Sequence, residues 1–166
     1  MPKSSGRPSF RALEVAACHE ILERNHVGRV AFAFRDRVDI EPIHYVFADN
    51  WIYGRSAPGA KLVTLQHNRW VAFEVDEVDG LFEWRSVVVH GAVYFLEPPS
   101  TPSSERRPDD EAGAVYDTAV ELLRRLVPAA LRHDDPTPAR SVVFRIHANE
   151  INGREASPHG EPDAAL

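Results

Sequence analysis

The sequence is short of the features that mark several protein classes. It has a single cysteine, so no internal disulfide can form, and its eight histidines show neither an HExxH motif nor the Cys/His spacing of a zinc site. No window reaches about 18 consecutive apolar residues, and the first ten residues contain no apolar segment. The 19 Lys and Arg are scattered among 25 Asp and Glu, and the net charge is −6. We therefore expect no metal, no nucleic-acid partner, no membrane partner and a cytoplasmic location.

What the sequence does contain is the composition of one globular domain. Its 166 residues are 43% hydrophobic and 27% charged, which is ordinary for a folded chain of this length. Pro, Ser, Gly and basic residues at the start predict a flexible arm over residues 1–9, and a polar end predicts a flexible tail over 156–166. Between them we expect a single domain, 10–155, in which residues 98–140 form a loop and helix insertion.

Apolar residues alternate with a period of two along most of the chain, which favours strands, and three segments show helical spacing. Cys18 lies on the apolar stripe of the first helix, so we expect a packed thiol rather than a nucleophile. Several strands in short succession predict a mainly β, α+β fold with an antiparallel sheet or barrel. The expected helices are Phe10–Asn25, Pro58–His67 and Asp109–Leu126. The expected strands are a hairpin over Val27–Ala48, then Trp51–Arg55, Trp70–Val75, Phe82–Leu96 and Ser141–His147. We expect an acidic turn before Phe82 and a separate segment, EINGRE, after the last strand.

The segment Trp51–Asn68 combines a strand, a turn of small residues and a helix with one lysine near its start. Ser56 can cap that helix, Pro58 suits its first turn, Gly59 leaves backbone N–H groups open, and Lys61 adds a positive charge. This pattern is typical of a site that holds an anion. It is not a P-loop, because an alanine separates glycine from lysine. An ordinary connection with a solvated lysine is the alternative interpretation.

Pro42 interrupts the strand pattern of the hairpin. Proline has no N–H to donate to a sheet ladder, so an edge strand or a bulge would explain it. A ligand that approaches the backbone at this point would also explain it, but an edge strand is the more common reason for such a proline.

Six motifs occur in an order that resembles the pyridoxamine 5'-phosphate oxidase-like flavoproteins, and is most similar to the branch related to the nitroimidazole-resistance proteins. The resemblance spans residues 12–96 and 142–154. It implies an antiparallel split β-barrel with flanking helices, a homodimer, and FMN held in a groove at the dimer interface. The motifs are VGRVAF at 27–32, PIHY at 42–45, RSAPGAKL at 55–62, VAFEVD at 71–76, WRSVVVHG at 84–91 and EINGR at 150–154.

The resemblance also implies roles for particular residues. Arg55 and Lys61 would hold the FMN phosphate, with a hydroxyl from Ser56 and backbone N–H groups around Gly59. Two further groups would lie along the isoalloxazine ring, although Trp84 is equally explained by packing and Arg85 by a surface charge. The residues of these groups are Pro42, Ile43 and His44 on one strand, and Trp84, Arg85 and Ser86 at the start of another.

The function that the resemblance implies is FMN-dependent oxidation or reduction of a small aromatic or conjugated molecule. His44 and His90 are the candidate proton donors near the ring, with packing or surface roles as the alternative. We do not expect oxidation of pyridoxamine phosphate itself, because the C-terminal arginine and histidine segment of those enzymes is missing. Two other hypotheses stay open: a reductase that uses the deazaflavin F420, and a non-catalytic flavin-binding or storage protein.

Overall fold

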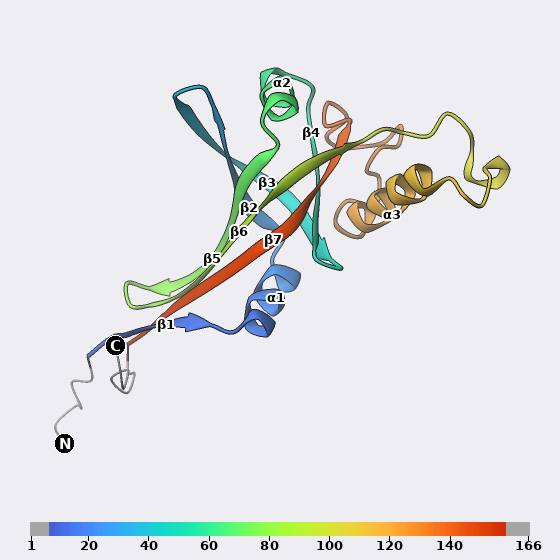
Figure 1. The fold of residues 1–166 in the computed structure, drawn as a ribbon. Helices are drawn as coiled ribbons and strands as arrows, with labels where there is room; N and C mark the ends of the chain where they lie inside the picture. Colours follow the sequence, from blue (N-terminus) through green and yellow to red (C-terminus); the bar gives the residue numbers. More distant parts are fainter. Residues whose placement is uncertain (1–6, 159–166) are drawn as a thin grey trace.

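The computed structural model describes residues 7–158, and Figure 1 shows how their helices and strands are arranged. The expected arm and tail lie largely outside this range, except that Ser9 and Ala156 belong to strands. No helix of the described part is long and apolar enough to cross a bilayer. The elements in chain order are β1 Ser9–Leu13, α1 Val15–Arg24, β2 Val27–Phe34, β3 Arg37–Ala48, β4 Trp51–Ser56, α2 Ala60–His67, β5 Trp70–Gly80, β6 Glu83–Leu96, a 3₁₀ turn Ser103–Glu105, α3 Glu111–Leu126 and β7 Val142–Ser157.

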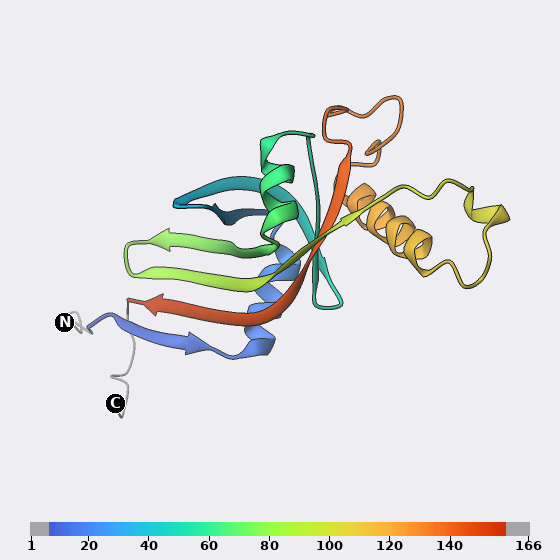
Figure 2. The same ribbon diagram turned by 45° about the horizontal axis from the view of Figure 1, so that its top comes forward.

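The strands form one antiparallel sheet that curls back on itself. Their order is β1-β7-β4-β3-β2-β5-β6, and β6 also pairs with β7, so six strands close a ring and β1 lies on its flank. Figure 2 shows the strands stacked around this ring with α3 extending to one side. The prediction of an antiparallel split barrel with flanking helices is confirmed.

The last strand, β7, holds the barrel together. Its first half pairs with β4 and its second half with β1, while β6 runs beside it for almost its whole length. The sequence predicted a strand that ended at His147, with EINGRE as a separate segment, and this was wrong. The ladder continues because β6 is long enough to pair with both halves across a bulge at Gly91. A Cβ at Gly91 would lie 1.8 Å from the carbonyl oxygen of His147, so the bulge requires glycine.

The core lies inside the ring and is closed at one end by α1. The inward residues of the strands alternate with outward ones, as the period of two predicts. Tyr45 is fully buried there and donates a hydrogen bond of 2.8 Å to the carbonyl of Leu22 in α1. Cys18 is also fully buried, and burial raises the pKa of its thiol. The prediction of a packed thiol is confirmed.

The helix α3 covers the outside of β3, β4 and β7. Asp110 caps it by accepting a hydrogen bond from the backbone N–H of Gly113, and its apolar stripe meets Val46, Tyr53 and Val143 on the strands. The predicted packing role of this helix is confirmed. The segment 127–141 that follows it returns to the barrel through a series of turns.

Three local predictions were wrong. The first helix does not begin at Phe10, because residues 9–13 pair with β7 as an edge strand. The acidic segment 76–80 is not a turn but the end of β5, where Arg29 and Arg24 neutralise Asp76 and Glu77. The third wrong prediction is the start of α2, which lies at Ala60 rather than at Pro58.

Candidate functional site

Four of the residues that the sequence singled out lie on the outer surface of the barrel. Inward neighbours such as Ile43 are buried in the core, so the alternate residues point outward. The side chain of Ile43 itself therefore faces the core, and only its backbone is near the outer face. The outward residues are Pro42 and His44 on β3, and Ser86 and His90 on β6.

A polar row crosses this face between β6 and β3. The hydroxyl of Ser86 donates to Glu74 at 3.1 Å, and Arg29 donates to the other oxygen of Glu74 at 3.1 Å. Arg29 also donates to Asp76 at 2.9 Å and lies opposite Pro42 in the ladder. Pro42 and Ser86 therefore both lie on the outer surface of the barrel, on strands that β2 and β5 separate.

Pro42 lies at a free edge. Strand β3 pairs with β2 along residues 37–44, but its ladder with β4 covers only residues 45–48. The missing N–H of Pro42 thus breaks no ladder, which agrees with the edge-strand interpretation. The same edge faces the segment between β4 and α2, so a ligand on the turn of that segment would lie next to β3.

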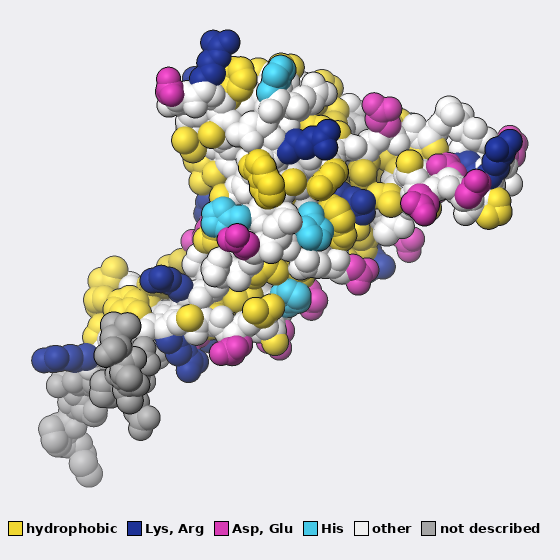
Figure 3. Space-filling view, in the orientation of Figure 1, with side chains coloured by type: hydrophobic (Ala, Val, Ile, Leu, Met, Phe, Trp, Pro, Cys, Tyr) yellow, Lys and Arg dark blue, Asp and Glu magenta, His cyan; other side chains and the backbone are white. Residues whose placement is uncertain are grey.

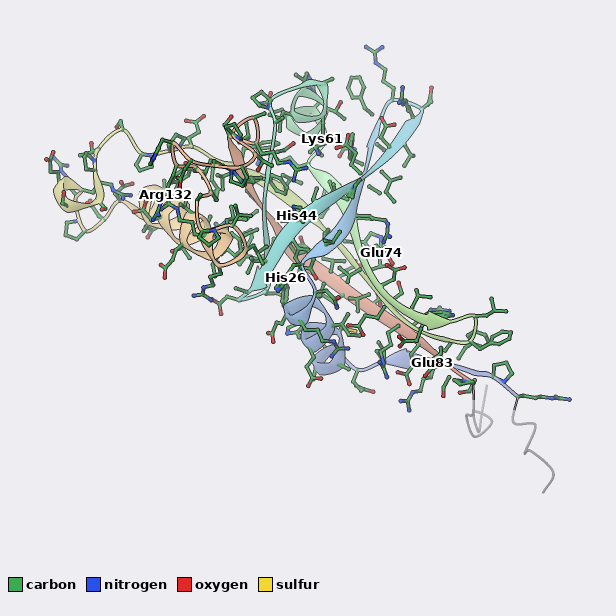
Figure 4. The ribbon with its side chains drawn as sticks, turned by 180° about the vertical axis from the view of Figure 1, so that it is seen from behind. His26, His44, Lys61, Glu74, Glu83 and Arg132 are labelled. Atoms are coloured by element: carbon green, nitrogen blue, oxygen red, sulfur yellow. The ribbon has the colours of Figure 1, made fainter. Side chains whose placement is uncertain are left out.

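That turn is open and carries one cation. The N-cap of α2 is Gly59, where an added Cβ would meet nothing within 4 Å. Lys61 donates to Glu41 on β3 at 2.5 Å, and the Glu41 side chain is 46% exposed. Figure 4 labels Lys61, near the start of α2, and His44 on β3. The predicted cap was wrong: the hydroxyl of Ser56 donates to the carbonyl of Ala57 at 3.3 Å, and the helix starts two residues after Pro58.

Arg55 lies in a different environment from Lys61. Its guanidinium is buried and forms a bidentate ion pair with Asp135, whose side chain is only 2% exposed. It also donates to the hydroxyl of Thr137 at 2.9 Å. Asp135 in turn accepts backbone N–H groups from Leu131 and Thr137, both at 2.8 Å. The hydrogen bonds from Arg55 hold the pKa of Asp135 well below its usual value. Arg55 and Lys61 thus have separate carboxylate partners in the structure, and their joint role in binding the FMN phosphate stays a prediction.

Trp84 and Arg85 have protein partners of their own. Trp84 is half-buried against Phe10, with ring centroids 6.2 Å apart. Arg85 donates to Glu155 at 3.3 Å. These contacts agree with the packing interpretation of Trp84 and the surface interpretation of Arg85. A role of either residue in binding the isoalloxazine ring stays a prediction.

Two cavities lie beside α3, away from the predicted residues. One, of about 570 Å³, is lined by Tyr94, Val115 and Arg145 among others, and the second, of about 550 Å³, by Tyr116, Arg124 and Arg132 among others. None of the predicted site residues lines either cavity. The predicted site residues Pro42, His44 and His90 are instead exposed on the outer surface of the sheet.

The sequence of the whole barrel matches a known family. Residues 14–155 match the model of the pyridoxamine 5'-phosphate oxidase family. This range runs from the start of α1 to the last residues of the strand β7. The chain belongs to this family. The resemblance inferred from six short motifs is confirmed, and it extends through the α3 insertion that the motifs did not cover.

Solved structures and a curated relative support the family assignment. A FAD-binding protein from Mesorhizobium loti is 30% identical, with a TM-score of 0.67 over 89% of this chain and 99% of that one. A candidate 5-nitroimidazole antibiotic resistance protein from Bacteroides thetaiotaomicron shares the fold at 15% identity, with a TM-score of 0.64 over 90% and 88% of the two chains. An uncharacterised protein of Rhizobium meliloti is 30% identical over 91 residues, which is 55% of this chain and 59% of that protein.

Sequence reasoning missed the partners of the predicted cations. Asp135 and Thr137 flank a proline, a pattern in which the aspartate accepts backbone N–H groups of its own turn, and this was the available signal. Glu41 and Glu74 gave no signal, because a carboxylate on a strand is usually solvated. Only the tertiary structure shows that they face Lys61 and Ser86.

Proposed function

We propose that this member of the pyridoxamine 5'-phosphate oxidase family binds FMN on the outer face of its barrel, as a homodimer, and catalyses oxidation or reduction of a small aromatic or conjugated molecule. The observation that carries the proposal is the open turn at Gly59 and Lys61, next to the free edge of β3, in a chain of this family. The FAD-binding relative, which is 30% identical over nearly its whole length, supports a flavin as the ligand.

The phosphate would lie at the start of α2. The N-terminal end of a helix offers unpaired backbone N–H groups and a partial positive charge, and Lys61 adds a full one. The empty space beside Gly59 lets a phosphate approach the backbone closely. Lys61 would then exchange its half-exposed partner Glu41 for the phosphate.

The isoalloxazine ring of the flavin would lie along the outer face of the sheet beyond Pro42. A bound flavin supplies the hydride chemistry itself, so the chain has only to bind and orient it. The free edge of β3 and the outward side chains of His44 and Ser86 provide polar contacts, while Arg29 and Glu74 form the charged floor of the surface. His44 and His90 remain the candidate proton donors.

A second copy of the chain would provide a second wall for this site. The outer face of β2 and β3 exposes a row of apolar side chains, among them Val27, Val38 at 73% and Ile40 at 62%. Apolar patches of this kind usually mark an interface. Burying them against a second barrel would also enclose a flavin that a single chain leaves open to water.

FAD is a second candidate because of the name of the Mesorhizobium loti relative. Chromatography of the flavin released from the purified protein separates the two, since FAD carries an adenylate that FMN lacks. A protein that is colourless after expression in a host with ample flavin, but binds F420, would support the deazaflavin hypothesis instead. A yellow protein that turns over with no donor and acceptor pair would support flavin storage.

The test of the site is the affinity of Lys61→Ala for FMN and for riboflavin, which lacks the phosphate. We expect FMN affinity to fall by more than about tenfold and riboflavin affinity to stay unchanged, since a hydrogen bond to a charged group contributes about 1.5 to 3 kcal/mol. Arg125→Ala is the matched control, because this exposed cation of α3 lies away from the turn. Equal FMN affinity in wild type and Lys61→Ala would refute the site.

The test of the homodimer is sedimentation at micromolar concentration. We expect the wild type to be a dimer and Ile40→Asp to be a monomer that no longer retains flavin. A monomeric, flavin-binding wild type would contradict the shared groove.

A further inference from the structure

A loop of the insertion is bound to the barrel next to the proposed ring site. The buried side chain of Arg55, on β4, uses both terminal nitrogens to bind the segment 131–140: Asp135 and Thr137 by their side chains, and the carbonyl of Arg140 at 3.4 Å. Two backbone bonds, Asp135 to Arg132 at 3.2 Å and Arg140 to Thr137 at 3.0 Å, make the segment a compact series of turns. The backbone of Arg140 is therefore fixed in place.

The side chain of Arg140 extends from that fixed backbone to the outer face. Its guanidinium lies 3.4 Å from Nδ1 of His44, on the free-edge part of β3. A guanidinium has only donors, so Nδ1 must accept and the proton of a neutral His44 ring is on Nε2. Among residues 7–158, no carboxylate forms an ion pair with Arg140. The positive charge of Arg140 is therefore not balanced by a carboxylate of the described residues.

We infer that Arg140 and His44 form a binding site for the carboxylate of a planar organic acid, which is the substrate or an inhibitor of the flavin site. The inference rests on the proposed function, because the acid would lie against the ring beyond Pro42. It adds the chemical class of the molecule that meets the flavin, and it assigns Arg55 and Asp135 as positioning residues for Arg140.

The donor set favours a carboxylate over a neutral group. The planar guanidinium of Arg140 offers parallel N–H donors that match the two oxygens of a carboxylate, and the imidazole of His44, 3.4 Å away, orients it. An uncharged amide would accept fewer of these bonds and would not compensate the charge. The two glutamates nearest in the ladder, Glu41 and Glu74, are already bound to Lys61 and to Arg29 with Ser86.

The experiment compares benzoate with benzamide, a neutral molecule of the same shape, on the flavin-loaded protein. Binding is read from the change in the flavin absorption spectrum and from isothermal titration calorimetry. We expect wild type to bind benzoate at least about tenfold more tightly than benzamide, and Arg140→Gln to reduce the ratio to about twofold or less. Arg132→Gln, which removes an exposed cation from the same loop, is the matched control and should keep the ratio of the wild type.

Three other outcomes are informative, and the first two contradict the inference. A benzoate preference that survives in Arg140→Gln, or no preference in wild type, would refute the acid site. A loss of FMN affinity in Arg140→Gln, with riboflavin affinity unchanged, would show that Arg140 holds the flavin phosphate instead. If the wild type binds no flavin, the proposed function fails, and calorimetry on the flavin-free protein decides the acid site by comparing Arg140→Gln with Arg132→Gln.

Discussion

Arg55 and Lys61 differ in what the fold does with their charge. They are six positions apart, and the family pattern assigns both to the same phosphate, yet Arg55 is buried against Asp135 while Lys61 meets the half-exposed Glu41. A buried cation with a bidentate partner and two further acceptors cannot release them without leaving Asp135 unpaired. A cation at an open turn can exchange its partner at little cost. If FMN binds as proposed, accessibility of the partner, rather than sequence proximity, decides which charge can bind its phosphate.

The carboxylate of a third ion pair lies between these two carboxylates in exposure. Glu77 on β5 accepts from Arg24 and Asn25, both at 2.7 Å, and its side chain is 23% exposed. The three carboxylates, Asp135 at 2%, Glu77 at 23% and Glu41 at 46%, form a series. If burial decides the role of each pair, the loss of folding stability on breaking them should fall in that order.

Breaking the most buried pair should have the largest effect. Arg55→Met keeps the bulk of the side chain but leaves the Asp135 carboxylate without its main partner, and it also releases Thr137. We expect the greatest fall in urea-unfolding stability of the three variants. The double variant Arg55→Met, Asp135→Asn should recover part of the loss, because the unpaired charge is gone. Wild-type stability of Arg55→Met would contradict a structural role.

The intermediate pair should show its effect through pH. The hydrogen bond from Arg24 lowers the pKa of Glu77 from 4.5 to about 2. Because the folded pKa lies below the unfolded one, the pair stabilises the fold fully above about pH 4.5, and this stability is lost as the pH falls towards 2. We expect Glu77→Gln to lose about 1 kcal/mol at pH 7, allowing for solvent screening, and to match the wild type near pH 2.

The readout for this pair is urea unfolding of wild type and Glu77→Gln between pH 2 and pH 7. Asp79→Asn is the control, since Asp79 is exposed on the same strand. A stability difference between wild type and Glu77→Gln that does not change with pH would rule out the ion pair as its source.

The most exposed pair should affect binding more than folding. Glu41→Gln removes the charge that competes for Lys61, so we expect a change in stability within about 0.5 kcal/mol. FMN affinity should rise by a few fold, and the gain should shrink as salt is added, because screening weakens exposed charges. Fluorescence titration at two ionic strengths measures it. Weaker FMN binding by Glu41→Gln would mean that Glu41 orients Lys61 rather than competing with the phosphate.

The elements with strong local patterns were predictable. The hairpin over residues 27–48 and the helix α3 follow from a clear period and, for α3, from acidic residues at its start. The strand β1 and the extension of β7 were not, because each is stabilised by pairing with a segment more than 50 residues away in sequence. Local spacing carries no information about such a partner.

The distribution of the site residues over the surface shows the same limit. Pro42 and Ser86 could be connected only through the family pattern, since they are separated by two strands and by the side chains of Arg29 and Glu74. Asp135 and Arg140 belong to a proline-punctuated loop that has no periodic pattern at all. Their roles depend on where Arg55 holds that loop.

The sequence by itself determined the fold class, the family and the existence of an open turn with one lysine, because period, motif order and turn residues are local properties. The tertiary structure alone decided which partner each cation has. Burial against Asp135 fixes Arg55 to the loop 131–140, whereas Lys61, itself 15% exposed, is paired with the half-exposed Glu41, and His44 is exposed at the free edge of β3. Figure 3 views the molecule from the side opposite to Figure 4 and shows that charged and apolar side chains are mixed over that face. The role of a charged side chain depends on its partners and on its distance from water, and packing fixes both.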